Sequence, residues 1–316
     1  MNRRIALSLL ATAVFSLSPA AAADQAMLRA VMPDAIVVAG ADVDRVMNSP
    51  FGQFMLDRMR AEEENLQKLI EMTGFDPRRD LREVLMASRV PQGKGSGLVM
   101  ARGTFDVSKL TATASTHGAV LDSYQGATIF NLSKAKTNTD IVALLSGLVL
   151  AGPHDDVRAA LDRLQATQST PAAITTQANL ASVQWDAWAV STGSPAQFAG
   201  AIKNPNVGGA LKGDVLQGIT QTSGGVRFGA NVEVGGEAVM RSAQDATALV
   251  DVYKFLLSMI QMNAPKAGPA ASQLQSFIGS MNVTTSGNVV KFTAQLPEAE
   301  LEKLINGGRH TTAQLR

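Results

Sequence analysis

The sequence VLMASRVPQGKGSGLVMARGTF, at residues 84–105, decides the fold class. It contains two extended apolar runs, at 84–90 and 97–105, and the linker between them is rich in proline, glycine and serine. Those residue types allow a chain to reverse, so the stretch predicts a β-hairpin and therefore antiparallel pairing. The linker is similar to a phosphate-binding loop only superficially, because it lacks the GxxxxGK(S/T) spacing and joins two strands rather than a strand and a helix.

Strands and helices alternate on both sides of this hairpin. Apolar runs bounded by turn residues predict the strands, and apolar residues spaced by three or four positions predict the helices. In the first half, strands and hairpins are expected at 35–40, 84–105, 119–132 and 141–152, and helices at 43–59, from 62–64 to Gly74, at 107–114 and from Pro153. In the second half, strands and hairpins are expected at 182–193, 216–235 and 281–296, and helices from Ser194–Pro195, at 239–262 and from Pro297.

Turn and capping residues give more local predictions. Asp42 is expected to cap the first long helix, and Ser49–Pro50 to interrupt it. Gly74 is expected to end the next helix in the left-handed conformation that glycine tolerates. The pair Gly224–Gly225 predicts the turn of the 216–235 hairpin.

The two halves follow the same order of elements without residue-level identity. We therefore predict an α+β fold with two similar lobes, each an antiparallel sheet covered on one face by helices in a ferredoxin-like βαββαβ order. The predicted divisions are a signal peptide at 1–23, an N-terminal α+β lobe at 24–166, a linker at 167–182, a C-terminal α+β lobe at 183–306 and a disordered tail at 307–316.

The N-terminus predicts export. Residues 1–4 are basic, 5–17 are apolar, and the small-residue stretch that follows is typical of a cleavage site, with Ala21–Ala22–Ala23 preceding Asp24. Export by the general secretory route is favoured over the twin-arginine route, and the mature protein is expected to be periplasmic or secreted, without a transmembrane segment. The chain has no cysteine, which excludes disulfides, thiolate metal sites and lipid attachment through cysteine.

Charge and composition exclude other classes. Loss of Arg3 and Arg4 with the signal peptide would change the net charge from +1 to about −1. A nearly neutral protein has no electrostatic footprint for nucleic acid or for anionic lipid. Aromatic residues make up only 5% of the chain, which weighs against a carbohydrate-stacking surface.

Charged residues cluster at 73–89, in TGFDPRRDLREVLMASR. The pattern predicts that Asp76 caps a short helical turn, with Pro77 at its first position and Asp80 in its first turn. Three arginines, Arg78, Arg79 and Arg82, would then lie on the outer face. The alternative is that they grip a phosphate or carboxylate group.

The same region carries a resemblance to a known group. The segments TGFDPRRDLREVLMAS, GLVMARGTFD, YQGATIFNL and LVLAGPHDDVRAALDRL, in this order, resemble uncharacterised exported bacterial proteins of the domain-of-unknown-function type with duplicated α+β lobes. The resemblance runs from about residue 33 to 306, and its recognisable motifs are in the first half. It implies architecture and compartment rather than activity, since the group has no established catalytic residues. Members are often anchored or lipidated, and this chain departs from them in lacking cysteine.

Candidate catalytic groups are few. Of the three histidines, His154 is the most interesting, because Asp155 and Asp156 follow it at a strand-to-helix junction. A periplasmic hydrolase using these residues is one alternative function. Helix capping by the aspartates is the structural alternative, and no HExxH or comparable metal-binding spacing occurs. We expect no cofactor, no metal and no enzymatic activity.

Flexible apolar side chains suggest binding instead. Their helical spacing fits ordinary core packing, but methionine-rich faces also bind varied hydrophobic partners. The leading prediction is a non-enzymatic exported protein that binds a partner protein or a hydrophobic molecule in a cleft between the lobes. A structural envelope component is the remaining alternative. The predicted cleft lining consists of Phe51, Phe54, Met55, Met59, Met259 and Met262.

Overall fold

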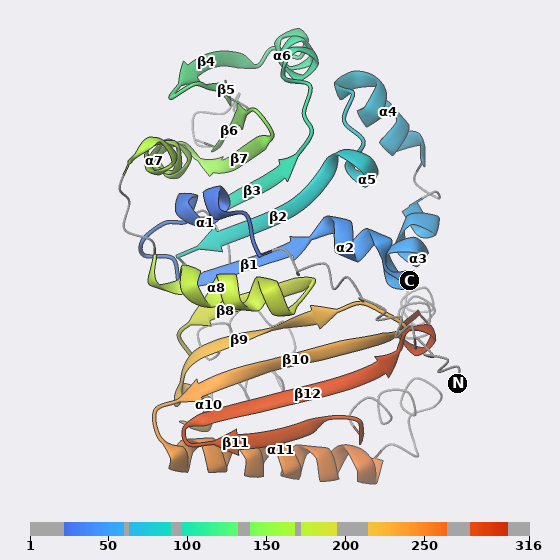
Figure 1. The fold of residues 1–316 in the computed structure, drawn as a ribbon, viewed down its shortest axis with the longest axis vertical. Helices are drawn as coiled ribbons and strands as arrows, with labels where there is room; N and C mark the ends of the chain where they lie inside the picture. Colours follow the sequence, from blue (N-terminus) through green and yellow to red (C-terminus); the bar gives the residue numbers. More distant parts are fainter. Residues whose placement is uncertain are drawn as a thin grey trace, which may run out of the picture.

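A computed structural model describes residues 22–59, 63–89, 97–131, 140–167, 172–194, 214–263 and 279–302. Its described strands form one twelve-stranded sheet in the order β11-β12-β10-β9-β8-β1-β2-β3-β7-β6-β5-β4, and every described pair is antiparallel (Figure 1). The strands are β1 Val37–Asp42, β2 Leu81–Ser88, β3 Gly97–Gly103, β4 Val120–Tyr124, β5 Ala127–Asn131, β6 Asp140–Leu145, β7 Leu148–Pro153, β8 Ala187–Thr192, β9 Ile219–Arg227, β10 Asn231–Met240, β11 Asn282–Ser286 and β12 Val289–Pro297.

The two halves of the chain meet at the centre of this sheet. β1 pairs with β8, from Val37 opposite Ser191 to Ala41 opposite Ala187. Outward from this pair the order is β1-β2-β3-β7-β6, followed by β5 and β4, on one side and β8-β9-β10-β12-β11 on the other. The α+β class is therefore confirmed, but duplicated ferredoxin-like lobes are not. The described strands of both halves form one continuous sheet joined by the β1–β8 pair, rather than two separate sheets.

Helices lie across the sheet and at its two ends (Figure 1). They are α1 Gln25–Ala30, α2 Val43–Asn48, α3 Pro50–Met59, α4 Glu63–Thr73, α5 Pro77–Asp80, α6 Val107–Thr116, α7 His154–Gln165, α8 Ala173–Gln184, α10 Asp214–Gln217 and α11 Ala243–Asn263. Residues 298–302 are also helical. Among the described helices, none is both long and apolar enough to cross a membrane.

The main core lies on one face of the sheet, which we call the packed face. The strand register places Val38 beside Ala87, Ala87 beside Leu98, and Met100 beside Leu150, so their side chains point to the same side. Residues of α1, α7 and α8 complete this core, among them Met27, Val157, Leu161, Ile174 and Ala178, all almost fully buried.

The opposite face, which we call the open face, is covered mainly near its ends. At its centre, Met86 on β2 and Val99 on β3 are adjacent in the register and about half exposed. Helices α4 and α6 lie towards the β5 end, where Phe130 and Val142 help to line a hollow beside them. At the other end α11 packs on a second, smaller apolar cluster that includes Ile219, Met240, Ala246, Val250 and Val290.

The local signals in the first half are confirmed. The Asp42 side chain accepts a hydrogen bond from the backbone N–H of Arg45 at the start of α2, and α2 ends before Pro50 begins α3. Gly74 follows α4 with a φ of 74°. The expected hairpins are present at β2–β3, β4–β5 and β6–β7.

The predicted turn at Gly224–Gly225 is wrong. Both glycines lie inside β9, paired with Gly236 and Gly235 of β10, and the chain reverses after Arg227 instead. The glycines provide space rather than a turn. A Cβ atom on Gly225 would lie 2.5 Å from the Cβ of Trp185, and one on Gly235 would lie 2.7 Å from its ring.

Other predicted segments differ from the structure or lie outside the described residues. The linker predicted at 167–182 contains most of α8, whose Ile174, Ala178 and Ala181 are buried in the main core. The sequence of α8 is rich in threonine and serine and has no side-chain N-cap, so it does not show the usual signals of a helix. The helix expected after Ser194–Pro195 and the tail at 307–316 lie outside the described residues, as do residues 1–21 of the predicted signal peptide.

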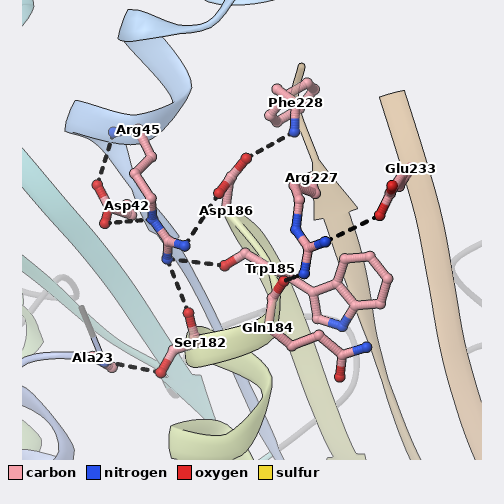
Figure 2. Close-up of polar contacts among 10 residues, drawn as sticks. All are labelled: Ala23, Asp42, Arg45, Ser182, Gln184, Trp185, Asp186, Arg227, Phe228 and Glu233. Carbon is pink, nitrogen blue, oxygen red and sulfur yellow. Dashed lines mark hydrogen bonds and ion pairs between the residues drawn. The ribbon is translucent and has the colours of Figure 1, made fainter. Parts of the chain in front are cut away.

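A polar network joins the two halves beside the β1–β8 pair (Figure 2). The Arg45 guanidinium donates to the carbonyl oxygens of Ser182 and Trp185 at the end of α8, at 2.9 and 3.2 Å, and lies 3.3 Å from the Asp186 carboxylate. Asp186 is buried and also accepts from the backbone N–H of Phe228 at 2.7 Å. A cation at a helix C-terminus is favourable, so Arg45 both caps α8 and neutralises a buried carboxylate.

Candidate ligand-binding site

An apolar pocket of about 400 Å³ lies between α4, α6 and the open face of the sheet. Its wall on the sheet side comes from adjacent strands, since Phe130 pairs with Val142, and Leu144 pairs with Val149. We call it the α4–α6 pocket, and it is lined by Leu69, Met72, Thr73, Phe75, Phe105, Leu110, Thr113, Ala114, His117, Phe130, Val142, Leu144 and Val149.

The two helices cover this part of the sheet without closing over it. Leu69 and Met72 of α4 are 40% and 45% exposed although they line the pocket. Helix α6 has no buried residue at all. Apolar side chains on these helices therefore face a space that the described residues do not fill, which is the arrangement expected of a ligand pocket rather than of a close-packed core.

Short-range contacts hold the two helices in place. Phe75, which follows α4, stacks on Phe105, which precedes α6, with ring centroids 5.3 Å apart. The Thr113 hydroxyl donates to the backbone carbonyl of Met72, which ties α6 to the end of α4. The turn after α4 depends on Gly74, whose positive φ is strained for other residues and whose Cβ position lies 3.1 Å from the Lys109 side chain.

The polar side chains of the lining are bonded to the backbone. Thr73 donates to the carbonyl of Leu69, and His117 Nδ1 lies 2.8 Å from the carbonyl oxygen of Thr113. The remaining lining side chains are hydrocarbon, apart from the thioether of Met72. The interior therefore presents an apolar surface, and His117, which follows α6 and is exposed, is a polar residue of its lining.

The residues predicted to line an interlobe cleft are placed differently. Phe51 stacks on Phe228 at a centroid distance of 4.7 Å and lies 6.4 Å from Phe54, while Met55 is half-buried in the same helix. Met59 ends α3, whereas Met259 and Met262 belong to α11, which lies along the β11 end of the sheet (Figure 1). The described structure brings Phe51 and Phe54 together but does not bring α3 against α11.

The arginine cluster is held largely by its own acids. Arg78 forms a bidentate contact with Asp76, at 2.9 and 2.8 Å, and Arg79 contacts both oxygens of Asp80 at 2.8 Å. The side-chain hydrogen bonds from these arginines hold the pKa values of Asp76 and Asp80 below their ordinary range. Arg82 is exposed on β2. As the sequence predicts, Asp76 caps α5 and Pro77 opens it.

The residues of the hydrolase alternative do not converge. His154 Nδ1 lies 2.9 Å from Asp155, but this aspartate is fully exposed. Asp156 instead accepts from Arg89 at 2.6 Å, and Arg89 also binds Asp34. Within the part of the chain that the structure describes, no cluster of three or more His, Cys, Asp or Glu side chains could hold a metal ion.

Sequence reasoning missed the α4–α6 pocket. The sequence predicts a helix that ends at Gly74 and the strands that form the pocket floor, but it does not predict that they meet. The available signal was the aromatic pair Phe75, which precedes the predicted hairpin, and Phe105, which ends it. Their stacking brings the two helices over the sheet only once β2 and β3 have paired.

Comparison with known proteins identifies no family. No protein-family model matches the chain, and no curated protein matches it. A solved structure described as "Structure of crystal form I of TP0453" is similar with a TM-score of 0.45 and 10% sequence identity, covering 89% of this chain and 96% of that chain. The resemblance to uncharacterised exported bacterial proteins therefore stays a prediction.

Proposed function

We propose that this protein is a non-enzymatic exported protein that binds a small hydrophobic molecule in the α4–α6 pocket. The observation that carries the proposal is the pocket itself, an apolar space of about 400 Å³ beside helices with exposed apolar side chains. This volume falls within the range of about 300–1,000 Å³ that is usual for small-molecule sites. The pocket replaces the interlobe cleft as the proposed binding place.

The lining defines the class of ligand. The lining is mainly aliphatic and aromatic, so burial of a ligand's hydrocarbon surface there would favour binding by about 25 cal/mol for each Å² removed from water. The hydroxyls of Thr73 and Thr113 already donate to backbone carbonyls. Polar groups of a ligand that were buried in the pocket would therefore find no hydrogen-bond donor there. A hydrocarbon ligand with at most one polar end, placed near the exposed His117, fits best.

Two substitutions on one helix test the proposal. Ala114→Trp in α6 puts an indole into the pocket, whereas Ala112→Trp puts the same group on the exposed surface of the same helix. With a fluorescent fatty-acid analogue as the probe, Ala114→Trp should weaken binding at least about tenfold and Ala112→Trp should leave it unchanged. Equal binding by both variants would contradict the site.

A milder variant guards against unfolding. Met72→Gln replaces a side chain that is already 45% exposed, so it should cost little stability while placing an amide in the pocket wall. Met72→Gln should also weaken binding of the fluorescent fatty-acid analogue. Native mass spectrometry of the gently purified wild-type protein should show an added mass of a few hundred daltons, and that mass should be absent from Ala114→Trp.

Partner binding is the second candidate, because Met86 and Val99 expose apolar surface at the centre of the open face. Partner binding would be favoured if the native mass spectrum shows no added mass and if a protein crosslinks to the wild type but not to Met86→Lys. A structural duplication also remains a proposal, supported by the matching orders β1-β2-β3-β7-β6 and β8-β9-β10-β12-β11.

A further inference from the structure

The backbone nitrogen of Asp24 faces a carboxylate. It lies 3.2 and 3.1 Å from the two Oε atoms of Glu83, which projects from β2 on the packed face. One peptide N–H is therefore shared by both oxygens of a carboxylate. Such a position suits a group with more than one proton to donate.

The position of Asp24 is fixed by the rest of the structure. Its side chain caps α1 by accepting from the N–H groups of Ala26 and Met27, at 2.8 and 3.0 Å. The same carboxylate binds Arg102 at 2.8 Å. Helix α1 is anchored in turn by the fully buried Met27 and the buried Leu28. Asp24 is therefore held in place by its hydrogen bonds and by the helix that it caps.

Among the described residues, Glu83 has no ion-pair partner. Arg102, whose charge acts on Glu83, is bonded to Asp24 and to the carbonyl of Gly147, and no lysine or arginine within the described residues forms an ion pair with Glu83. Burial raises the pKa of Glu83 to about 7, and the negative charges of Asp24 and Asp42 add to this effect. The carboxylate is thus poorly neutralised when Asp24 carries an ordinary peptide nitrogen.

We infer that the chain is cleaved between Ala23 and Asp24 and that the new α-ammonium group of Asp24 forms a half-buried ion pair with Glu83. Hydrolysis by an endopeptidase of the export machinery breaks the bond between the Ala23 carbonyl carbon and the Asp24 nitrogen. Water supplies the hydroxyl group of the released carboxyl and one proton of the amine, which takes a further proton at neutral pH. A cation then lies where the structure holds an unpaired carboxylate.

The geometry distinguishes this site from its neighbour. The small residues around 20–23 would also allow cleavage after Ala22, which would place the ammonium on Ala23. The Ala23 nitrogen donates to the Ser182 hydroxyl at 2.8 Å, which is a neutral acceptor in a buried place (Figure 2). A buried ammonium is far better matched by a carboxylate. Ser182 keeps a partner after Ala23 is lost, because its hydroxyl also donates to the carbonyl of Asn179.

The first test is the mass of the full-length protein after export from a bacterial host. The measured mass should equal that of a chain that begins at Asp24. A mature chain that begins at Ala22, Ala23 or any other residue would overturn it. This readout does not depend on the proposed ligand, so the failure of either proposal leaves the other standing.

The second test compares proteins prepared to begin at Asp24 or at Ala22. The Glu83 carboxyl, followed by NMR, should titrate about 1–3 pH units lower in the protein that begins at Asp24, because an opposite charge within about 4–6 Å favours the ionised form. The α-amine of the protein that begins at Asp24 should also react more slowly with an acylating reagent at pH 8 than that of the protein that begins at Ala22. Glu83→Gln in the Asp24 protein should restore the reactivity, and identical Glu83 titration in both proteins would refute the ion pair.

Discussion

Replacing Arg45 with alanine should destabilise the whole fold, since this side chain joins the two halves of the sheet. Its guanidinium contacts the carbonyls of Ser182 and Trp185, the Asp42 side chain at 2.8 Å and the buried Asp186. The substitution removes the cap of α8 and leaves the Asp186 carboxylate with the Phe228 N–H as its remaining described partner. Both consequences raise the free energy of the folded state.

The magnitude follows from burial. Removing one partner of a fully buried ion pair costs about 3–5 kcal/mol. Asp186 is 7% exposed at its side chain but Arg45 is 28% exposed, so water can enter beside the carboxylate and reduce that cost. We expect a loss of about 2–4 kcal/mol. Arg227 provides a matched control, because its pair with Glu233 is 49% and 37% exposed and it also caps α8 through Gln184. Arg227→Ala should cost about 1 kcal/mol.

Urea unfolding of the two variants measures the difference. Arg45→Ala should lower the midpoint clearly more than Arg227→Ala, with an unchanged slope. A cycle with Asp186→Asn should show coupling of about 1–2 kcal/mol, since the two side chains are in contact. If Arg45→Ala costs no more than Arg227→Ala, or if the coupling is absent, the network does not hold the halves together and the reasoning fails.

Two further predictions concern packing and pH. Gly235→Val should cost about 1–3 kcal/mol in urea unfolding, because its Cβ would lie 2.7 Å from the Trp185 ring, whereas Gly229→Ala, with its nearest atom at 3.4 Å, should change little. In a chain that retains Ala23, Glu83 has a folded pKa of about 7 against an ordinary 4.5, so its contribution to stability is full below pH 4.5 and is lost as the pH rises through 7. Glu83→Gln should flatten that part of the pH profile, and an unchanged profile would contradict the assignment.

Local features could be predicted from the sequence because nearby residues decide them. The N-caps at Asp42 and Asp76 depend on side chains within three residues of the N–H groups that they satisfy. The turn at 286–288 likewise contains Gly287, which has a φ of 59°. These elements give the same answer at the level of propensity, capping and apolar pattern, so the prediction was secure.

Features that depend on distant residues could not be predicted in the same way. Gly224 and Gly225 resemble a turn in isolation, and only the bulk of Trp185 above the sheet shows why they lie in a strand. Helix α8 buries small and hydroxylated residues such as Thr175 and Ser182, so its composition resembles that of a linker. The pairing of β1 with β8 joins segments about 150 residues apart, and the sequence of neither strand indicates which strand it pairs with.

The division of the sheet into a packed face and an open face separates the main core from the pocket that we propose as the binding site. On the packed face, Leu98 and Leu150 are fully buried, and truncating either to alanine should cost about 2–5 kcal/mol. On the open face, the pocket walls include Leu69 and Met72, which are already 40% and 45% exposed, so they hold the fold less strongly. A hydrocarbon ligand would cover this surface without displacing the core. If the proposed binding is correct, single substitutions in these exposed walls should change ligand affinity while the fold tolerates them, and for this reason Met72→Gln is expected to reduce binding with little loss of stability.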